Sequence, residues 1–134
     1  PSCVLTNVTN PRSQVNRKTL YEKTLIRRGA TVGANATIVC GITLGRYSFI
    51  GAGAVVTKDV PNYGLVLGNP GKLSGFMSRH GHKLHFDENN QAICPESHFR
   101  YQRKGEYVRC LDLNEDKPLP DELSVGSKSY DEFK

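Results

Sequence analysis

The stretch that decides the fold is residues 26–61, IRRGATVGANATIVCGITLGRYSFIGAGAVVTKDVP. Every sixth residue in it is aliphatic, and a small or branched residue follows four positions after each. The aliphatic set is Ile26, Val32, Ile38, Leu44, Ile50 and Val56, and the second set is Ala30, Ala36, Ile42, Ser48, Ala54 and Val60. This period matches neither an α-helix nor the alternation of a strand. It is typical of a parallel β-helix, in which each six-residue unit forms one side of a triangular prism.

Three such units make one coil of about 18 residues, so this stretch predicts two full coils. We expect the aliphatic residue of each unit to fill the prism interior and the residue four positions later to share it. Glycine follows three of the aliphatic positions, at Gly33, Gly45 and Gly51. We expect these glycines to allow the bend between sides.

Composition limits the function classes. The chain has 134 residues, a formal net charge of +5, 37% hydrophobic residues and no Trp, which suits one domain with a thin aliphatic core. The basic residues are scattered without aromatic interleaving, which argues against nucleic acid and leaves a solvated surface or a few cations placed for a polyphosphate. We find no membrane-length apolar run and no signal peptide, and the four cysteines are widely spaced. We therefore expect a cytoplasmic protein with free thiols.

The chain divides into three parts in sequence. Residues 1–72 are predicted to form the β-helix, with a polar excursion loop at residues 8–25. Residues 73–83 are a polar exit that we expect to hold a helical turn, and residues 84–111 alternate short strand signals with turns. Residues 73–111 thus form a small β extension, and residues 112–134 are expected to be a flexible tail. The fold class predicted is all-β.

The start of the chain falls in the middle of a six-residue unit. Cys3 takes a small inward position and Leu5 the next aliphatic one. A solenoid coil buries its face only against its neighbours. We therefore expect the sequence to be the C-terminal part of a longer protein, although a ragged first coil is the alternative.

The repeat array, the strand Leu5–Val8 followed by Asn10-Pro11-Arg12-Ser13, and the turn Gly68-Asn69-Pro70 together resemble the hexapeptide-repeat acyltransferases. More narrowly they are similar to N-acetyltransferases of 3-amino groups on nucleotide-linked sugars, such as those acting on UDP-2-acetamido-3-amino-2,3-dideoxyglucuronate. The resemblance covers residues 1–80. It implies a left-handed β-helix, a homotrimer, acetyl-CoA as co-substrate, no metal, and a role in surface polysaccharide or lipopolysaccharide biosynthesis. That family usually has alanine where Gly71 stands, a change that we expect to matter little sterically.

The resemblance also implies roles for particular residues. Asn7 matches the position that orients the acceptor amine, although an Asx-turn cap is the alternative. Arg12, with Asn10 beside it, is expected to contact the sugar nucleotide. The coenzyme A site is expected to use the turn Gly68, Asn69 and Pro70 with Lys72, the small residues Gly51, Ala52 and Gly53, and the cation Lys58. The alternatives are that the glycine-containing segments are ordinary turns and that the two lysines are only solvated.

Two other interpretations are weighed against this one. A zinc site could use Cys94, His98 and Cys110 with His80, His82 or His85, but no paired CxxC is present, and isolated thiols and surface imidazoles are favoured. A trimeric β-helix scaffold without catalysis is the alternative function.

Overall fold

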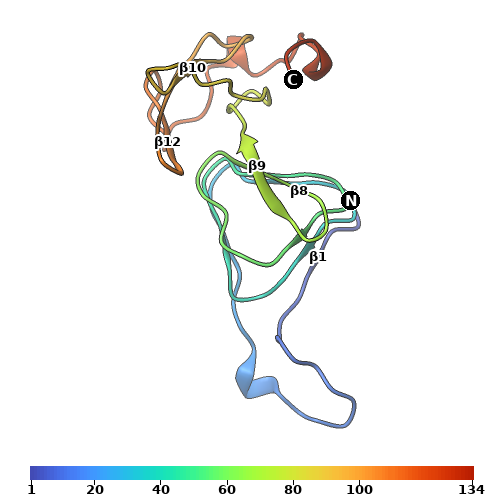
Figure 1. Cartoon of the computed structure of the whole chain (residues 1–134). Coiled ribbons are helices and arrows are strands. Elements are labelled where there is room, and N and C mark those ends of the chain that lie inside the picture. Colours follow the sequence, from blue (N-terminus) through green and yellow to red (C-terminus); the bar gives the residue numbers. More distant parts are fainter.

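The computed structural model describes all residues 1–134 and shows a triangular β-helix, a small antiparallel sheet and a tail (Figure 1). The chain turns clockwise from blue to green toward the viewer, so the β-helix is left-handed (Figure 1). The predicted fold class is confirmed. Left-handed crossovers are exceptional among parallel strands.

Each side of the prism is a stack of short parallel strands. Face A contains β1 (Val4–Leu5), β4 (Thr37–Ile38) and β7 (Val55–Val56). Face B contains β2 (Leu25–Ile26) and β5 (Thr43–Leu44), which a bridge from Leu44 links to Val60. Face C contains β3 (Thr31–Val32), β6 (Phe49–Ile50) and β8 (Gly64–Leu67), extended by the antiparallel β9 (Lys72–Phe76).

The strand register confirms the predicted coil length. Leu25 pairs with Thr43, and Thr37 pairs with Val55, so each pair is one 18-residue coil apart. Val4 instead pairs with Thr37, 33 positions on, and the excess of 15 residues is the excursion loop. This loop leaves the prism at the A–B corner, which consists of the turns that join face A to face B. It contains one 3-10 turn, η1 (Lys18–Leu20).

The residues predicted to point inward form one core. Those with no more than a tenth of their surface exposed are Ala36, Ile38, Ile42, Leu44, Ser48, Ile50, Ala54, Val56 and Val60. Ala30 and Val32 pack against this core, and Ile26 is 44% exposed because it lies in the first coil. The period-six interpretation is therefore confirmed from the second coil onward.

The prediction that Gly33, Gly45 and Gly51 allow the bend between sides of the prism is wrong. Gly33, Gly45 and Gly51 do not adopt left-handed backbone conformations; Asn35, Tyr47 and Gly53, two positions later, do. A Cβ on Gly33 would lie 2.5 Å from the Ala52 backbone nitrogen of the next coil. Gly33 and Gly45 are required because successive coils stack too closely for a side chain, whereas a Cβ on Gly51 would meet the Leu67 side chain.

The exit from the prism is a strand and not the expected helical turn. β9 crosses the end of the prism (Figure 1) and leads to a sheet of β10 (Gln91–Ile93), β11 (Arg100–Lys104) and β12 (Tyr107–Cys110). This extension has its own core. Tyr63, which follows the last coil, belongs to this second core: its ring stacks on Tyr47 at 5.5 Å and meets Tyr101 edge-on at 5.4 Å.

The tail contacts the rest of the molecule at several points and holds two 3-10 turns, η2 (Asp121–Leu123) and η3 (Tyr130–Glu132). Arg46 pairs with Asp116, and the Tyr47 hydroxyl donates to the Glu115 carbonyl at 2.7 Å. The flexibility of residues 112–134 stays a prediction. None of the helical turns has the length and apolar character needed to cross a bilayer.

The register makes a prediction about stability. Ile38→Asp and Ile50→Asp each place a carboxylate at a position with no exposed surface and no partner, at a cost of about 5 kcal/mol or more. Lys18→Asp, in the exposed loop, is the control and should change stability little. Thermal midpoints measure all three, and equal midpoints would contradict the six-residue register.

Candidate functional site

The expected coenzyme residues other than the two lysines meet at the C–A corner, which consists of the stacked turns that join face C to face A. The Gly53 amide donates to the Ala34 carbonyl of the previous coil at 2.8 Å. On the other side, the Val55 amide donates to the Gly68 carbonyl at 3.0 Å. One edge of the prism therefore holds the turns Gly51–Gly53 and Gly68–Pro70 in neighbouring coils. The two turns are 15 or more positions apart in sequence. Ala52, Gly53, Gly68, Asn69 and Pro70 are all exposed there.

Two glycines of this corner, Gly51 and Gly71, are closely packed. A Cβ on Gly51 would lie 2.5 Å from Leu67 Cδ2. A Cβ on Gly71 would lie 2.7 Å from the Val55 carbonyl oxygen and 2.9 Å from Val66 Cγ1. The expectation that alanine at position 71 matters little sterically is therefore wrong for this backbone. Gly71 also donates its amide to that Val55 carbonyl at 2.7 Å, which holds the turn against face A.

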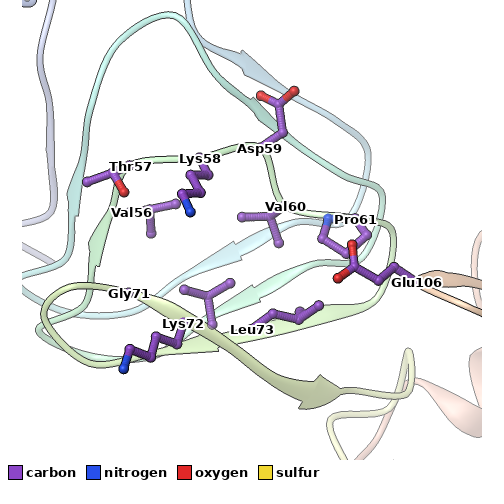
Figure 2. A pocket seen from close by; sticks show the side chains of 11 residues that line it. Val56, Thr57, Lys58, Asp59, Val60, Pro61, Gly71, Lys72, Leu73 and Glu106 are labelled. Atoms are coloured by element: carbon purple, nitrogen blue, oxygen red, sulfur yellow. The ribbon is translucent and has the colours of Figure 1, made fainter.

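Lys58 and Lys72 line one cavity of about 320 Å³ at the end of the prism. Val56, Val60 and Val66, the last inward residues of the coils, form its apolar floor. Lys58 points toward the middle of the cavity, while Lys72 and Glu106 lie at opposite edges (Figure 2). Glu106, from the turn between β11 and β12, lines this cavity although no sequence pattern predicts it. The lining also contains Asp59, so the two lysines are balanced by two carboxylates in formal charge. Lys58 and Lys72 can contact the anionic part of a ligand, and the valine floor can contact its organic portion.

Asn7 lies at the A–B corner, where the excursion loop begins and ends. Its carbonyl accepts a hydrogen bond from the Glu22 amide at 2.9 Å, and its side chain is exposed. Within the loop, Asn10 Oδ1 accepts from Arg17 Nε at 3.1 Å. The Arg12 carbonyl accepts from the Val15 amide at 3.2 Å, and the Arg12 side chain is exposed. Asn7, Asn10 and Arg12 thus share one loop, separated from the C–A corner by face A.

Glu22 is a feature of this corner that sequence reasoning missed. Its carboxylate accepts from Thr9 Oγ1 at 2.6 Å and from the Cys40 thiol at 3.3 Å. These hydrogen bonds, Thr9 first, lower the pKa of Glu22 below its ordinary 4.5. The contacts therefore stabilise the loop above that pH and are lost as the pH falls through the lowered pKa. Thr9, Glu22 and Cys40 are far apart in sequence and form no motif. Their contact becomes visible only in the structure, where the loop returns to the prism beside Asn7.

The repeat region is similar to a known protein family and to several named acetyltransferases. Residues 23–58 match the family model described as bacterial transferase hexapeptide (six repeats). The coiled part of this chain therefore contains hexapeptide repeats of the kind that this family model describes. A dTDP-3-amino-3,6-dideoxy-alpha-D-galactopyranose 3-N-acetyltransferase of Aneurinibacillus thermoaerophilus is 43% identical over 74 residues, which cover 55% of this chain and 38% of the relative. A putative acetyltransferase of Staphylococcus aureus is 40% identical over 68 residues, covering 48% of this chain and 34% of the relative.

A solved structure agrees with the β-helix. The hexapeptide-repeat acetyltransferase of Vibrio cholerae, complexed with acetyl coenzyme A, has a TM-score of 0.50 at 26% identity, covering 58% of this chain and 44% of that one. The chain spans well under half the length of the relatives it matches. The likeness is therefore to one part of those proteins, the part that contains the repeats.

The histidines and cysteines of this hexapeptide-repeat protein do not assemble into a metal site. No group of three or more His, Cys, Asp or Glu side chains is placed to hold a metal ion. Cys94 and Cys110 are buried free thiols in the extension core. The expectation of surface imidazoles is wrong for His80 and His82, whose side chains are 5% and 2% exposed and face the Glu96 carboxylate at 3.6 and 2.9 Å.

Gly71 yields a direct test of the C–A corner. Gly71→Ala should lower the free energy of unfolding by about 1–3 kcal/mol, because the new methyl group meets a backbone carbonyl that cannot move alone. Gly126→Ala is the matched control, since a Cβ there meets nothing within 4 Å. Urea denaturation measures both. Equal stability of the two variants would show that the turn relaxes at no cost.

Proposed function

We propose that this protein is an acetyl-CoA-dependent N-acetyltransferase that acts on the 3-amino group of a nucleotide-linked sugar. The observation that carries the proposal is the C–A corner, where two small-residue turns stack and lead directly to a cavity with two lysines. Two relatives support the proposal. The Aneurinibacillus relative is named a 3-N-acetyltransferase, and the Vibrio structure is a complex with acetyl coenzyme A.

The coenzyme is proposed to lie along the C–A corner. Gly51, Ala52 and Gly53 with Gly68, Asn69 and Pro70 provide a small-residue edge that a pantetheine arm can approach closely. Lys58 and Lys72 are proposed to meet its phosphates as point charges. Acetyl transfer breaks the bond from the acetyl carbon to the thioester sulfur and forms a bond to the sugar nitrogen, which loses a proton. No metal is required for this chemistry.

The acceptor is proposed to enter at the excursion loop. The amine must be unprotonated to attack, and its electron-withdrawing sugar neighbours lower its pKa, so an orienting acceptor suffices in place of a strong base. Asn7 is proposed to orient the amine, while Asn10 and Arg12 contact the sugar nucleotide. The Thr9, Glu22 and Cys40 contacts hold the base of that loop in place.

A homotrimer is proposed to bring the two parts together. Within one chain, face A separates the loop from the coenzyme corner. Face C carries the extension, whereas Val4 and Leu25, which face outward from faces A and B, are 53% and 50% exposed. Packing of prisms through those faces would cover this apolar surface and let one protomer's loop approach a neighbour's coenzyme. Sedimentation equilibrium should give three times the 14.8 kDa of one chain; a stable monomer would contradict this.

The coenzyme proposal is tested by titration calorimetry. Lys72→Ala should weaken coenzyme A binding by roughly tenfold, about 1.4 kcal/mol, and the effect should shrink at high salt. The same variant should lose less affinity for dephospho-coenzyme A if Lys72 contacts the 3′-phosphate. Lys128→Ala, in the tail, is the control. No binding of coenzyme A by the wild type would leave the scaffold as the better account.

The acceptor proposal is tested by kinetics on the intact protein. Asn7→Ala should lower kcat by roughly 10- to 100-fold and leave coenzyme A affinity unchanged, because an orienting hydrogen bond is worth about 1–3 kcal/mol. Asn7→Asp should shift the pH–rate profile upward, since a carboxylate stabilises the ammonium form of the amine and raises its pKa. An unchanged kcat with a lowered thermal midpoint would assign Asn7 a purely structural role in the loop.

A further inference from the structure

A second cavity lies at the seam between the prism and the extension. It has a volume of about 230 Å³ and is separate from the cavity of Lys58 and Lys72, with which it shares no residue. Gly29 and Tyr47 line it from the prism, and Arg79, His80 and Gly81 line it from the segment after β9. Because a Cβ on Gly29 would fall 2.2 Å from Tyr47 Cδ1, the Tyr47 ring lies directly on the Gly29 backbone.

Arg79 brings a positive charge to this cavity without a negative partner. Its guanidinium carbon lies 4.3 Å from the centre of the Tyr47 ring. Nη1 and Nη2 donate to the carbonyls of Asn114 and Lys117 at 3.3 and 2.6 Å, whereas Nε is buried and has no hydrogen-bond partner. Carbonyl groups satisfy these donors but do not neutralise the charge of the half-buried guanidinium.

Three carboxylates of the tail and the extension are engaged elsewhere. Asp116 pairs with Arg46, and Glu115 Oε1 accepts from the Tyr63 hydroxyl and the Cys110 amide. Glu96 accepts from His82, Ser127 and Lys128. None of these three forms an ion pair with Arg79, so its guanidinium is available to an anion from outside this chain.

His80 provides a second unsatisfied polar group in the same cavity. Its side chain is 5% exposed, and Nδ1 has no partner. Its other ring nitrogen lies 3.6 Å from Glu96 Oε1, an oxygen that His82 already contacts at 2.9 Å. Buried polar groups without partners are rare in native proteins and indicate a bound water, ion or ligand. Water would satisfy His80 but would leave Arg79 uncompensated.

We propose that this cavity binds a small oxyanion, the phosphate or carboxylate group of a small molecule, with Arg79 as its cation and His80 as a second polar contact. The Tyr47 ring, stacked on the guanidinium, holds Arg79 in place. The site goes beyond the proposed acetyl transfer and does not depend on it, because it uses neither the C–A corner nor the excursion loop.

The test compares inorganic phosphate, acetate and chloride at equal ionic strength by thermal unfolding. Phosphate, acetate or both should raise the midpoint by about 2–5 °C relative to chloride, and the better of the two identifies the preferred group. The rise should persist in the double variant Lys58→Ala/Lys72→Ala, which removes the proposed coenzyme cations, and in Arg103→Met, which removes an arginine outside the cavity. It should disappear in Arg79→Met and shrink in Arg79→Lys.

A second measurement does not depend on how well the variants fold. In the wild type, the NMR signal of the Arg79 Nε–H should move in a saturable way as phosphate or acetate is added, and chloride should leave it in place. Equal midpoints in the three salts, an unmoved Nε–H signal, or a phosphate effect lost only with Lys58 and Lys72 would each overturn the proposal. None of these outcomes bears on acetyl transfer, which coenzyme A titration tests separately.

Discussion

The whole molecule depends on the narrow interior of a triangular prism. Each side contributes one aliphatic side chain and one small or branched one per coil, and the core residues from Ala36 to Val66 are almost fully excluded from solvent. Coils stack so closely that a Cβ on Gly33 or Gly45 would lie 2.5–2.6 Å from a backbone nitrogen of the next coil. Fixed spacing in the sequence therefore becomes fixed stacking in space, because a one-residue slip would turn every inward side chain outward.

Stacking of this kind also creates a site without any long-range motif. The turns 51–53 and 68–70 lie at one corner because each completes face C at the same point of the coil, as the Gly51 amide to Val66 carbonyl hydrogen bond of 2.9 Å shows. The excursion loop inserts 15 residues at another corner without altering the register of face A. In the proposed function, the rigid edge binds the coenzyme and the projecting loop binds the acceptor.

Much of this architecture could be predicted from the sequence. The period of six fixed the inward residues from Ala36 to Val60, and the break in the period located the loop. The role of Gly33, Gly45 and Gly51 was misjudged because a sequence shows where a chain bends but not how closely neighbouring coils approach. β9 was missed because its strand partner, β8, lies across a tight turn with a register shift. Glu22, Glu106 and the Arg79–His80 pair were missed because their neighbours come from distant segments.

The most direct test of the account is a map of backbone amide shifts as coenzyme A is added to the isotopically labelled protein. The account predicts that the perturbed amides lie on the C–A corner, at residues 51–53 and 68–72, and at Lys58 across the end of the prism. The B–C corner, which joins faces B and C at residues 27–29, 45–47 and 61–63, should stay unperturbed. Perturbation centred on the B–C corner, or none at the C–A corner, would contradict the claim that stacked small-residue turns form the coenzyme site.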